Sequence, residues 1–185
     1  MARQYTVAVI IGSLRKEAFS RKTANALVKL APPELKLEIV EIADLTFYNQ
    51  DLDASPHPSW VKFREAIKPH DAVLFVTPEY NRSMPGVFKN ALDVGSRPYG
   101  SSVWDGKPGA IVSVSPGAIG GFGANQHLRQ VLTFLNVITL QQPEAYVGGA
   151  GALFDDKGEL TNDKTREFLT KLLAAFAALV GKLKA

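Results

Sequence analysis

Cysteine is absent from the 185-residue chain. Without it the protein forms no disulfide bond, has no thiolate-ligated metal and carries no cysteine nucleophile. Long hydrophobic runs are absent too: the apolar run at residues 7–11 is shorter than a signal peptide requires, and LLAAFAALVG near the C-terminus is too short to span a bilayer. We therefore expect a cytoplasmic protein without membrane insertion.

Neither sign of charge is clustered along the sequence. Lysine and arginine number 21, aspartate and glutamate 18, which gives a net charge of +3 and a pI of about 9.1. The basic residues are scattered and no basic run contains interleaved aromatics, so a nucleic-acid partner is not expected. A mildly positive surface instead suits the attraction of small anions.

Signals for metal and hydrolytic sites are also missing. The histidines, His57, His70 and His127, lack the spacing of metal ligands, and Asp155 and Asp156 do not match a calcium-loop pattern. No G-x-S-x-G nucleophile motif occurs. We therefore expect no bound metal.

Apolar, β-branched segments alternate with segments of helical character along the whole chain. Strands are expected at residues 5–12, 35–42, 71–77, 109–115 and 137–147, and helices at 19–31, 57–68, 84–96, 123–136 and 162–184. This alternation predicts an α/β fold, a doubly wound five-stranded parallel sheet with helices on both faces. We expect one domain over residues 1–185, with the polar segment 44–58 as an ordered surface loop.

The expected topology locates a ligand site before any motif is considered. Ligands of doubly wound sheets bind outside the carboxyl ends of the strands, where the strand order reverses. The segments that follow the expected strands are residues 12–20, 43–51, 78–84 and 115–123. These loops are therefore where site residues should lie.

The first of these loops, GSLRKEAFSRK from Gly12, has the composition of an anion site. It leads into a helix whose N-terminus offers unpaired amides, while Ser13 and Ser20 supply hydroxyl groups and Arg15 a guanidinium. It matches neither the Rossmann G-x-G-x-x-G pattern nor the P-loop pattern. The alternative is that both serines cap the helix and Arg15 is a solvated surface charge.

The second loop, TPEYNRS, predicts a rigid elbow after a buried strand. Pro78 fixes its own φ, so the backbone groups of Glu79, Tyr80 and Asn81 are preorganised to face the edge of a flat polar ring. The Tyr80 ring adds an aromatic surface, and Ser83 is the expected N-cap of the next helix. The alternative is that Tyr80 packs on the surface and Glu79 is an ordinary loop acid.

The third loop, SPGAIGGFGAN at residues 115–125, is rich in glycine. Glycine permits positive φ and close approach of the backbone to a ligand. We interpret this loop as a third wall of the same site, against the alternative of a plain flexible turn.

Four motifs, GSLRK, TPEYN, PGVFKNALD and SRP, resemble the NADPH-dependent FMN reductase family, most closely its chromate- and quinone-reducing branch. The resemblance implies a flavodoxin-like sheet of order 2-1-3-4-5 with one FMN per subunit. It implies that Ser13, Arg15 and Ser20 hold the FMN phosphate. The full set of implied cofactor-binding residues is Ser13, Leu14, Arg15, Phe19, Ser20, Pro78, Glu79, Tyr80, Asn81, Ser115 and Gly117.

The chain departs from the family pattern at several positions. Ala18 stands where relatives commonly have a serine, so one phosphate donor is missing and Ser20 carries more of the load. Arg82 and the Val94–Gly95 pair replace aromatic residues. Arg82 and the Val94–Gly95 pair lie on the acceptor side of the implied pocket, whereas Ala18 lies on its phosphate side.

The implied activity is that of an FMN-dependent NAD(P)H oxidoreductase. NADPH or NADH would deliver a hydride to the flavin and leave, and a quinone would then take two electrons in ping-pong order; chromate, azo and nitro compounds are further candidate acceptors. No catalytic side chain is expected, only flavin ligands. The alternatives are a flavodoxin-type electron carrier without turnover, against which the basic pI argues, and a flavin-bearing sensor.

The resemblance also implies a homodimer or homotetramer. Residues 127–136 form an amphipathic helical segment, and in such families helices near the flavin edge commonly build subunit contacts. Arg97, Tyr99 and Arg129 are our candidates for such an interface.

Overall fold

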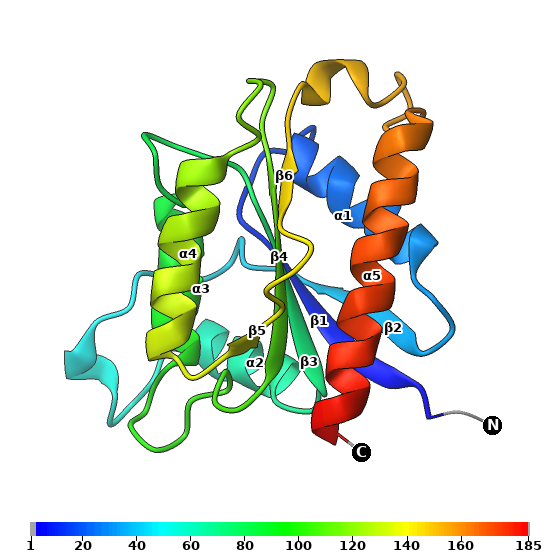
Figure 1. Ribbon diagram of the computed structural model, residues 1–185. Coiled ribbons are helices and arrows are strands. Elements are labelled where there is room, and N and C mark those ends of the chain that lie inside the picture. The colour runs from blue at the N-terminus through cyan, green and yellow to red at the C-terminus, as the bar shows by residue number, and fades with distance from the viewer. Residues whose placement is uncertain (1–2, 185) are drawn as a thin grey trace.

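Parallel strands form the centre of the molecule in this computed structural model, which describes residues 3–184 (Figure 1). The sheet order is β2-β1-β3-β4-β5, and β6 pairs with β4. The strands are β1 (Tyr5–Ile11), β2 (Leu35–Val40), β3 (Ala72–Thr77), β4 (Pro108–Val114), β5 (Ile138–Thr139) and β6 (Ala145–Val147). This order confirms the flavodoxin-like doubly wound topology, because β1 and β3 are neighbours and the chain winds outward from them in both directions.

Two layers of helices cover the sheet. They are α1 (Phe19–Leu30), α2 (Pro58–Ile67), α3 (Gly86–Gly95), α4 (Phe122–Phe134) and α5 (Asp163–Lys184). In Figure 1, α1 and α5 lie on one side of the strands, and α2, α3 and α4 on the other. None of the helices within residues 3–184 combines the length and apolarity needed to cross a membrane.

The alternation of side chains along each strand gives the sheet a core on both faces. Val7 and Val9 of β1 belong to the core beneath α1 and α5, whereas Ala8 and Ile10 belong to the core beneath α2, α3 and α4. All four are fully buried. Burial on both faces explains why β1 reads as a continuous apolar run instead of an alternating one.

The fifth expected strand, residues 137–147, is divided in two. β5 pairs with β4 at Pro108 and Gly109, and β6 pairs with it near the other end, at Val112–Val114. Pro143 lies between the two short strands. Because proline has no amide hydrogen to donate, the chain cannot continue a ladder through this position.

The polar segment after β2 is ordered, as expected. It contains the short 3₁₀ helix η1 (Gln50–Leu52), which Asn49 caps through a side-chain hydrogen bond. The amide of Tyr48 donates to Asn90 Oδ1 on α3 (2.8 Å), and Trp60 Nε1 on α2 donates to the Thr46 carbonyl (3.0 Å). These contacts fix the segment over α2 and α3.

Candidate functional site

A cleft of about 250 Å³ opens where the carboxyl ends of β1, β3 and β4 meet. Three loops contribute to it, each the direct continuation of one of these strands. Its lining residues are Ser13, Arg15, Ala18, Phe19, Ser20, Pro78, Glu79, Tyr80, Val114, Ser115 and Pro116. We call this the strand-end cleft.

The structure thus brings together eight of the eleven residues implied as cofactor ligands. Leu14, Asn81 and Gly117 do not line the cleft, although each is a chain neighbour of a residue that does. Leu14 is half exposed. Ala18, Val114 and Pro116 also line the cleft. None of them was predicted as a ligand, because their side chains carry no recognisable chemistry.

The first loop presents an open helix terminus to the cleft. The N-cap of α1 is Ala18, which makes no side-chain capping bond, so the alternative in which Ser13 and Ser20 cap this helix is wrong. Within residues 3–184 the amides of Phe19 and Ser20 donate no hydrogen bond, and the Arg15 guanidinium forms no ion pair. Unpaired amides, a positive helix end and a free guanidinium together form an anion site.

Ser20 adds an unsatisfied hydroxyl to this terminus. The residue is buried, and its Oγ has no hydrogen-bond partner among the described residues. An unpartnered buried hydroxyl costs about 1–3 kcal/mol. A phosphate held at this helix terminus would supply the missing partner, so the residues present fit the phosphate of FMN.

Gly12 allows the first loop to lie close to α3. A Cβ at this position would be only 2.6 Å from Cδ1 of Phe88, a fully buried ring. Any side chain here would displace the loop that contains Ser13 and Arg15.

The second loop is a tight turn and not merely a rigid exit. The amides of Tyr80 and Ser83 donate to each other's carbonyl groups at 2.9 and 3.0 Å, and Asn81 and Arg82 between them have φ of 51° and 64°. Two consecutive positive φ angles define a type I′ turn. The Tyr80 amide is therefore used within the protein, and our expectation that it faces a ligand is wrong. The Tyr80 ring is 52% exposed.

Ser83 is not the N-cap of α3. Pro85 occupies that position and the helix begins at Gly86. The Ser83 hydroxyl instead forms a 2.7 Å hydrogen bond with Nδ1 of His127 on α4. The turn is therefore attached to a helix more than forty residues further along the chain.

Glu79 makes a second attachment to α4. The N-cap of this helix, Gly121, has no side chain, and the amide of Ala124 in its first turn donates to Glu79 Oε2 at 2.9 Å. Glu79 thus caps a helix from outside it, and its negative charge lies at the positive end of that helix. A Cβ at Gly123 would lie 2.9 Å from both Glu79 Oε2 and the Arg82 carbonyl oxygen, so glycine permits this close contact.

The third loop is pinned and not flexible. The Gly117 amide donates to Ser115 Oγ (3.1 Å), and the Ala150 amide donates to the Ser115 carbonyl (3.1 Å). Gly120 has φ of 64°, and a Cβ there would lie 2.6 Å from the Tyr146 carbonyl carbon. The segment after β6 therefore supports this wall.

The sequence analysis missed the contacts that hold the second and third loops. Gly123, Ala124, His127 and Ala150 carry no motif of their own. Each acts through a backbone group, a missing side chain or a partner distant in sequence. Their roles become visible only when the loops are seen together.

Two of the histidines named in the sequence analysis, His57 and His70, have structural partners. His57 caps α2 by accepting from the Ser59 amide, and buried His70 lies 3.3 Å from Glu38. No group of three or more histidine or acidic side chains within residues 3–184 has the arrangement of a metal site.

The candidate interface residues divide into two kinds. Arg129 is mostly buried and donates to the Leu140 carbonyl (3.2 Å), so it belongs to the interior of its own chain. Arg97 lies 4.1 Å from the ring centre of Tyr99, which is 84% exposed. Tyr99 is thus the one of the three that a partner could cover extensively.

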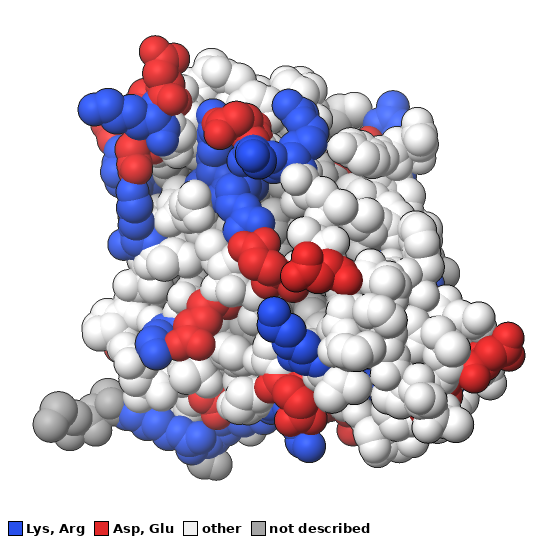
Figure 2. Space-filling view, turned by 180° about the vertical axis from the view of Figure 1, so that it is seen from behind, with Lys and Arg blue, Asp and Glu red and all other residues white. Residues whose placement is uncertain are grey.

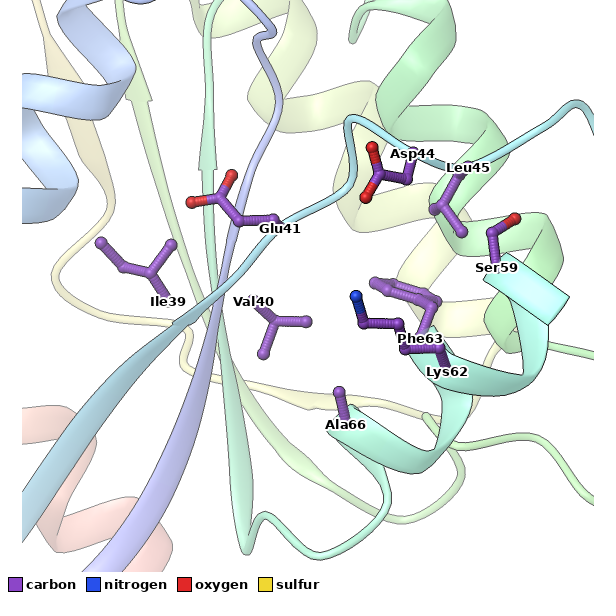
Figure 3. A pocket seen from close by; sticks show the side chains of 9 residues that line it. All are labelled: Ile39, Val40, Glu41, Asp44, Leu45, Ser59, Lys62, Phe63 and Ala66. Atoms are coloured by element: carbon purple, nitrogen blue, oxygen red, sulfur yellow. The ribbon is translucent and has the colours of Figure 1, made fainter.

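A second hollow of about 310 Å³ lies at the carboxyl end of β2 (Figure 3). Phe63 and Ala66 of α2 line one side, and the charged side chains of Glu41, Asp44 and Lys62 surround the opening. None of the implied cofactor ligands lines it.

Comparison with known proteins agrees with this geometry. The quinone reductase of Pseudomonas putida is 61% identical over 181 residues, covering 97% of both chains. The 2-hydroxy-1,4-benzoquinone reductase of a Burkholderia species is 44% identical and covers 94% of this chain and 95% of its own. The solved structure of FerB, a flavoenzyme NAD(P)H:(acceptor) oxidoreductase from Paracoccus denitrificans, has a TM-score of 0.90 at 40% identity and covers 96% of this chain and 98% of its own.

The family assignment rests on most of the chain. Residues 5–152 match the family described as NADPH-dependent FMN reductase, a range that includes all three loops of the strand-end cleft. With the sheet order, the open helix terminus and the full-length relatives in agreement, this chain belongs to the NADPH-dependent FMN reductase family.

Proposed function

We propose that the protein is an FMN-dependent NAD(P)H oxidoreductase that reduces quinones by ping-pong two-electron transfer. The observation that carries this proposal is the strand-end cleft, which is lined both by an open helix terminus with Arg15 and Ser20 and by the loop residues Pro78–Tyr80. Such a cleft suits a ligand that has a phosphate at one end and a flat polar ring at the other.

Each end of the cleft has a distinct task in this proposal. Arg15, the free amides of α1 and the Ser20 hydroxyl bind the phosphate. Pro78, Glu79 and Ser115 shape the walls around the ring. When bound, FMN supplies the redox chemistry, accepting a hydride and passing two electrons to an acceptor.

The chain contributes orientation and electrostatics to this chemistry. The backbone amide of Glu79, a residue that lines the cleft, has no partner within residues 3–184 and is available to the proposed ring. Donors that are fixed before reaction stabilise negative charge without reorganisation. We propose no side chain as a catalytic acid or base.

Quinones are the proposed acceptors because relatives across the full chain are named for quinone reduction. The exposed Tyr80 ring offers a surface on which a flat acceptor packs. Chromate, azo and nitro compounds are further proposed acceptors.

The assembly and the compartment are part of the same proposal. We propose one FMN-binding domain over the whole chain, a homodimer or homotetramer, and a cytoplasmic location where NAD(P)H is produced. Phe134 is 87% exposed and Tyr99 84%, and burial of these two side chains between subunits would remove apolar area from water. Light scattering coupled to size exclusion measures the assembly.

The decisive experiment begins with the absorbance spectrum of the purified protein. We expect bound oxidised flavin, loss of quinone reduction when FMN is removed, and recovery when it is restored. Steady-state NADPH oxidation in the presence of a quinone separates an enzyme from an electron carrier. Turnover by flavin-free protein, or a stable semiquinone with no turnover, would contradict the proposal.

A further inference from the structure

One buried amide side chain joins α4 to two strands of the sheet. Asn125 of α4 is fully buried, and its Nδ2 donates to Ser113 Oγ on β4 (3.3 Å) and to the Ala145 carbonyl on β6 (3.2 Å). Its Oδ1 accepts from Arg129 Nε, one turn further along the helix (3.2 Å). The side chain thus uses both its donor and its acceptor, as the burial of a polar group requires.

Surface charge contributes little to holding this helix. Figure 2 shows few charged side chains on the α3 and α4 side of the molecule, at the viewer's right, whereas Lys and Arg side chains gather over the α1 side. Within residues 3–184, α4 forms one ion pair, between Arg129 Nε and Glu144 Oε1, which are 3.7 Å apart. The buried amide is therefore the stronger attachment, because a hydrogen bond in the interior is less weakened by water.

The start of α4 also lies very close to the strands. A Cβ at Gly121, the N-cap, would be 3.1 Å from Ser113 Cβ. Close packing of this kind prevents the helix from moving toward the sheet. The hydrogen bonds of Asn125 prevent it from moving away, so the first turn of α4 has a fixed distance from β4 and β6.

The same turn of α4 holds the second loop of the strand-end cleft. The residue before Asn125, Ala124, donates its amide to Glu79 Oε2 at 2.9 Å, and Gly123 leaves room for this carboxylate. Glu79 lines the cleft, and its own amide is available to the proposed ring. An unbroken series of contacts therefore leads from the sheet through Asn125 and the Ala124 amide to the wall of the cleft.

We propose that Asn125 is a positioning residue for the flavin site. It fixes the first turn of α4 where the Ala124 amide holds Glu79 in the wall of the strand-end cleft. Asn125 itself does not line the cleft, so its effect on FMN passes through Glu79. This inference rests on the proposed function and assigns a further residue to the same site.

The variant Asn125→Leu tests the inference, because it keeps the approximate size of the side chain and removes its hydrogen bonds. Ser113 Oγ also donates to the Ala145 carbonyl (3.3 Å), so these two groups keep each other as partners and the variant should fold. FMN affinity should fall about tenfold, a typical size for coupling within one hydrogen-bond network. Fluorescence titration of the flavin measures the loss.

Asn90→Leu on α3 is the matched control. Asn90 is also a buried amide side chain on a helix, and it accepts from the Tyr48 amide and donates to the Thr46 carbonyl. None of these three residues lines the cleft. The control should lose stability but keep its FMN affinity within about twofold of the parent's. An equal loss of FMN affinity in the two Leu variants would overturn the inference, because Asn125 would then contribute only general stability.

Two double-mutant cycles test whether Asn125 acts through Glu79. When Glu79→Ala is already present, adding Asn125→Leu should change FMN affinity by less than about twofold, because the contact that transmits the effect is gone. When Arg15→Ala is present instead, the two losses should multiply, because Arg15 belongs to the phosphate end of the cleft. Losses that multiply in the Glu79 cycle as well would contradict a route through Glu79.

Hydrogen exchange of the parent protein needs neither a variant nor flavin. The Ala124 amide should be strongly protected before FMN is added. Exchange at the rate of a solvent-exposed amide would show that the attachment is not fixed and would rule out the positioning role.

The proposed function and this inference fail in different ways. If the protein binds no FMN, the proposed function fails, and unfolding of the flavin-free variants Asn125→Leu, Glu79→Ala and their combination still measures the coupling of the two residues. Additive losses of stability there would overturn the inference, and non-additive losses would support it. If the protein binds FMN with equal affinity in the parent and in Asn125→Leu, only the inference fails.

Discussion

Ser20 and Thr23 are equally buried but have different relations to the proposed ligand. Both lie on α1, both are fully buried, and neither hydroxyl has a hydrogen-bond partner among the described residues. Ser20 lines the strand-end cleft and Thr23 does not. A binding role and a merely structural one can therefore be compared on a single helix.

We predict that Ser20→Ala has opposite effects on the two states of the protein. Without FMN, the free energy of unfolding should stay constant or rise by about 1 kcal/mol, because an unsatisfied group is removed. FMN affinity should fall, because the phosphate loses a donor. Thr23→Val is the control. It should leave the free energy of unfolding without FMN equally unharmed, and it should not change the FMN affinity. Equal flavin affinities for both variants would contradict the role of Ser20.

Arg15 should supply the charged contact to the phosphate. We predict that Arg15→Ala weakens FMN binding by about 1.5–3 kcal/mol, the range for hydrogen bonds to charged groups. Fluorescence titration of the flavin measures this loss. Lys16→Ala removes an adjacent exposed cation that does not line the cleft, and it should change FMN affinity far less. A comparable loss of FMN affinity in both variants would mean that Arg15 acts only through the overall positive charge and makes no direct contact with the phosphate.

At the scale of elements, the site depends on how one helix holds a loop. The first turn of α4 has no capping side chain of its own and takes the carboxylate of Glu79, while His127 on its second turn bonds Ser83. The turn between them places Asn81 and Arg82 at positive φ, a conformation that asparagine adopts readily but that costs a residue such as Arg82 about 1–2 kcal/mol. The attachments to α4 stabilise a turn that Arg82 by itself disfavours.

We predict that Glu79→Ala destabilises the protein by about 0.5–2 kcal/mol through loss of the helix cap, and also weakens FMN binding because the turn is released. Thermal and denaturant unfolding measure the first effect and flavin titration the second. Glu79→Gln keeps an acceptor oxygen and should retain most of both properties. If Gln and Ala variants behave alike, the charge and not the capping bond is responsible.

At the scale of the whole molecule, the cleft joins three strands that are distant in sequence. β1, β3 and β4 are adjacent in the sheet, and their loops meet only in the folded protein. A ligand bound between them therefore stabilises the fold as a unit.

We predict that FMN at one hundred times its Kd adds about 2.7 kcal/mol to the free energy of unfolding, which raises Tm by roughly 5–11 °C for a chain of this size. Riboflavin, which has the same ring without the phosphate, is the matched control and should raise Tm much less at equal concentration. Equal shifts would mean that the open terminus of α1 contributes nothing to binding.

The sequence predicted much of this architecture because its signals are local. Buried strands such as β1 are continuous apolar runs, and the helices between them have their own periodicity, so the order of elements follows from the pattern of the chain. The loops that line the cleft follow from the same reasoning, because the carboxyl ends of parallel strands meet at one edge. The family motifs in the first two loops then indicated the ligand. Arg15, Ser20 and Pro78 line the cleft for these reasons.

Only the tertiary structure decided how the loops are held. The sequence predicted Ser83 as a helix cap, but it bonds His127, and it predicted a free Tyr80 amide, which closes a turn instead. Glu79 caps α4 across 45 residues, a contact that no local pattern encodes. Local propensity and periodicity act within a few residues, whereas these hydrogen-bond partners depend on how the elements pack against one another. The sequence by itself therefore indicated the three loops that form the site, together with residues 43–51, which do not line the cleft, and the folded chain determined which groups in the three loops remain free to bind.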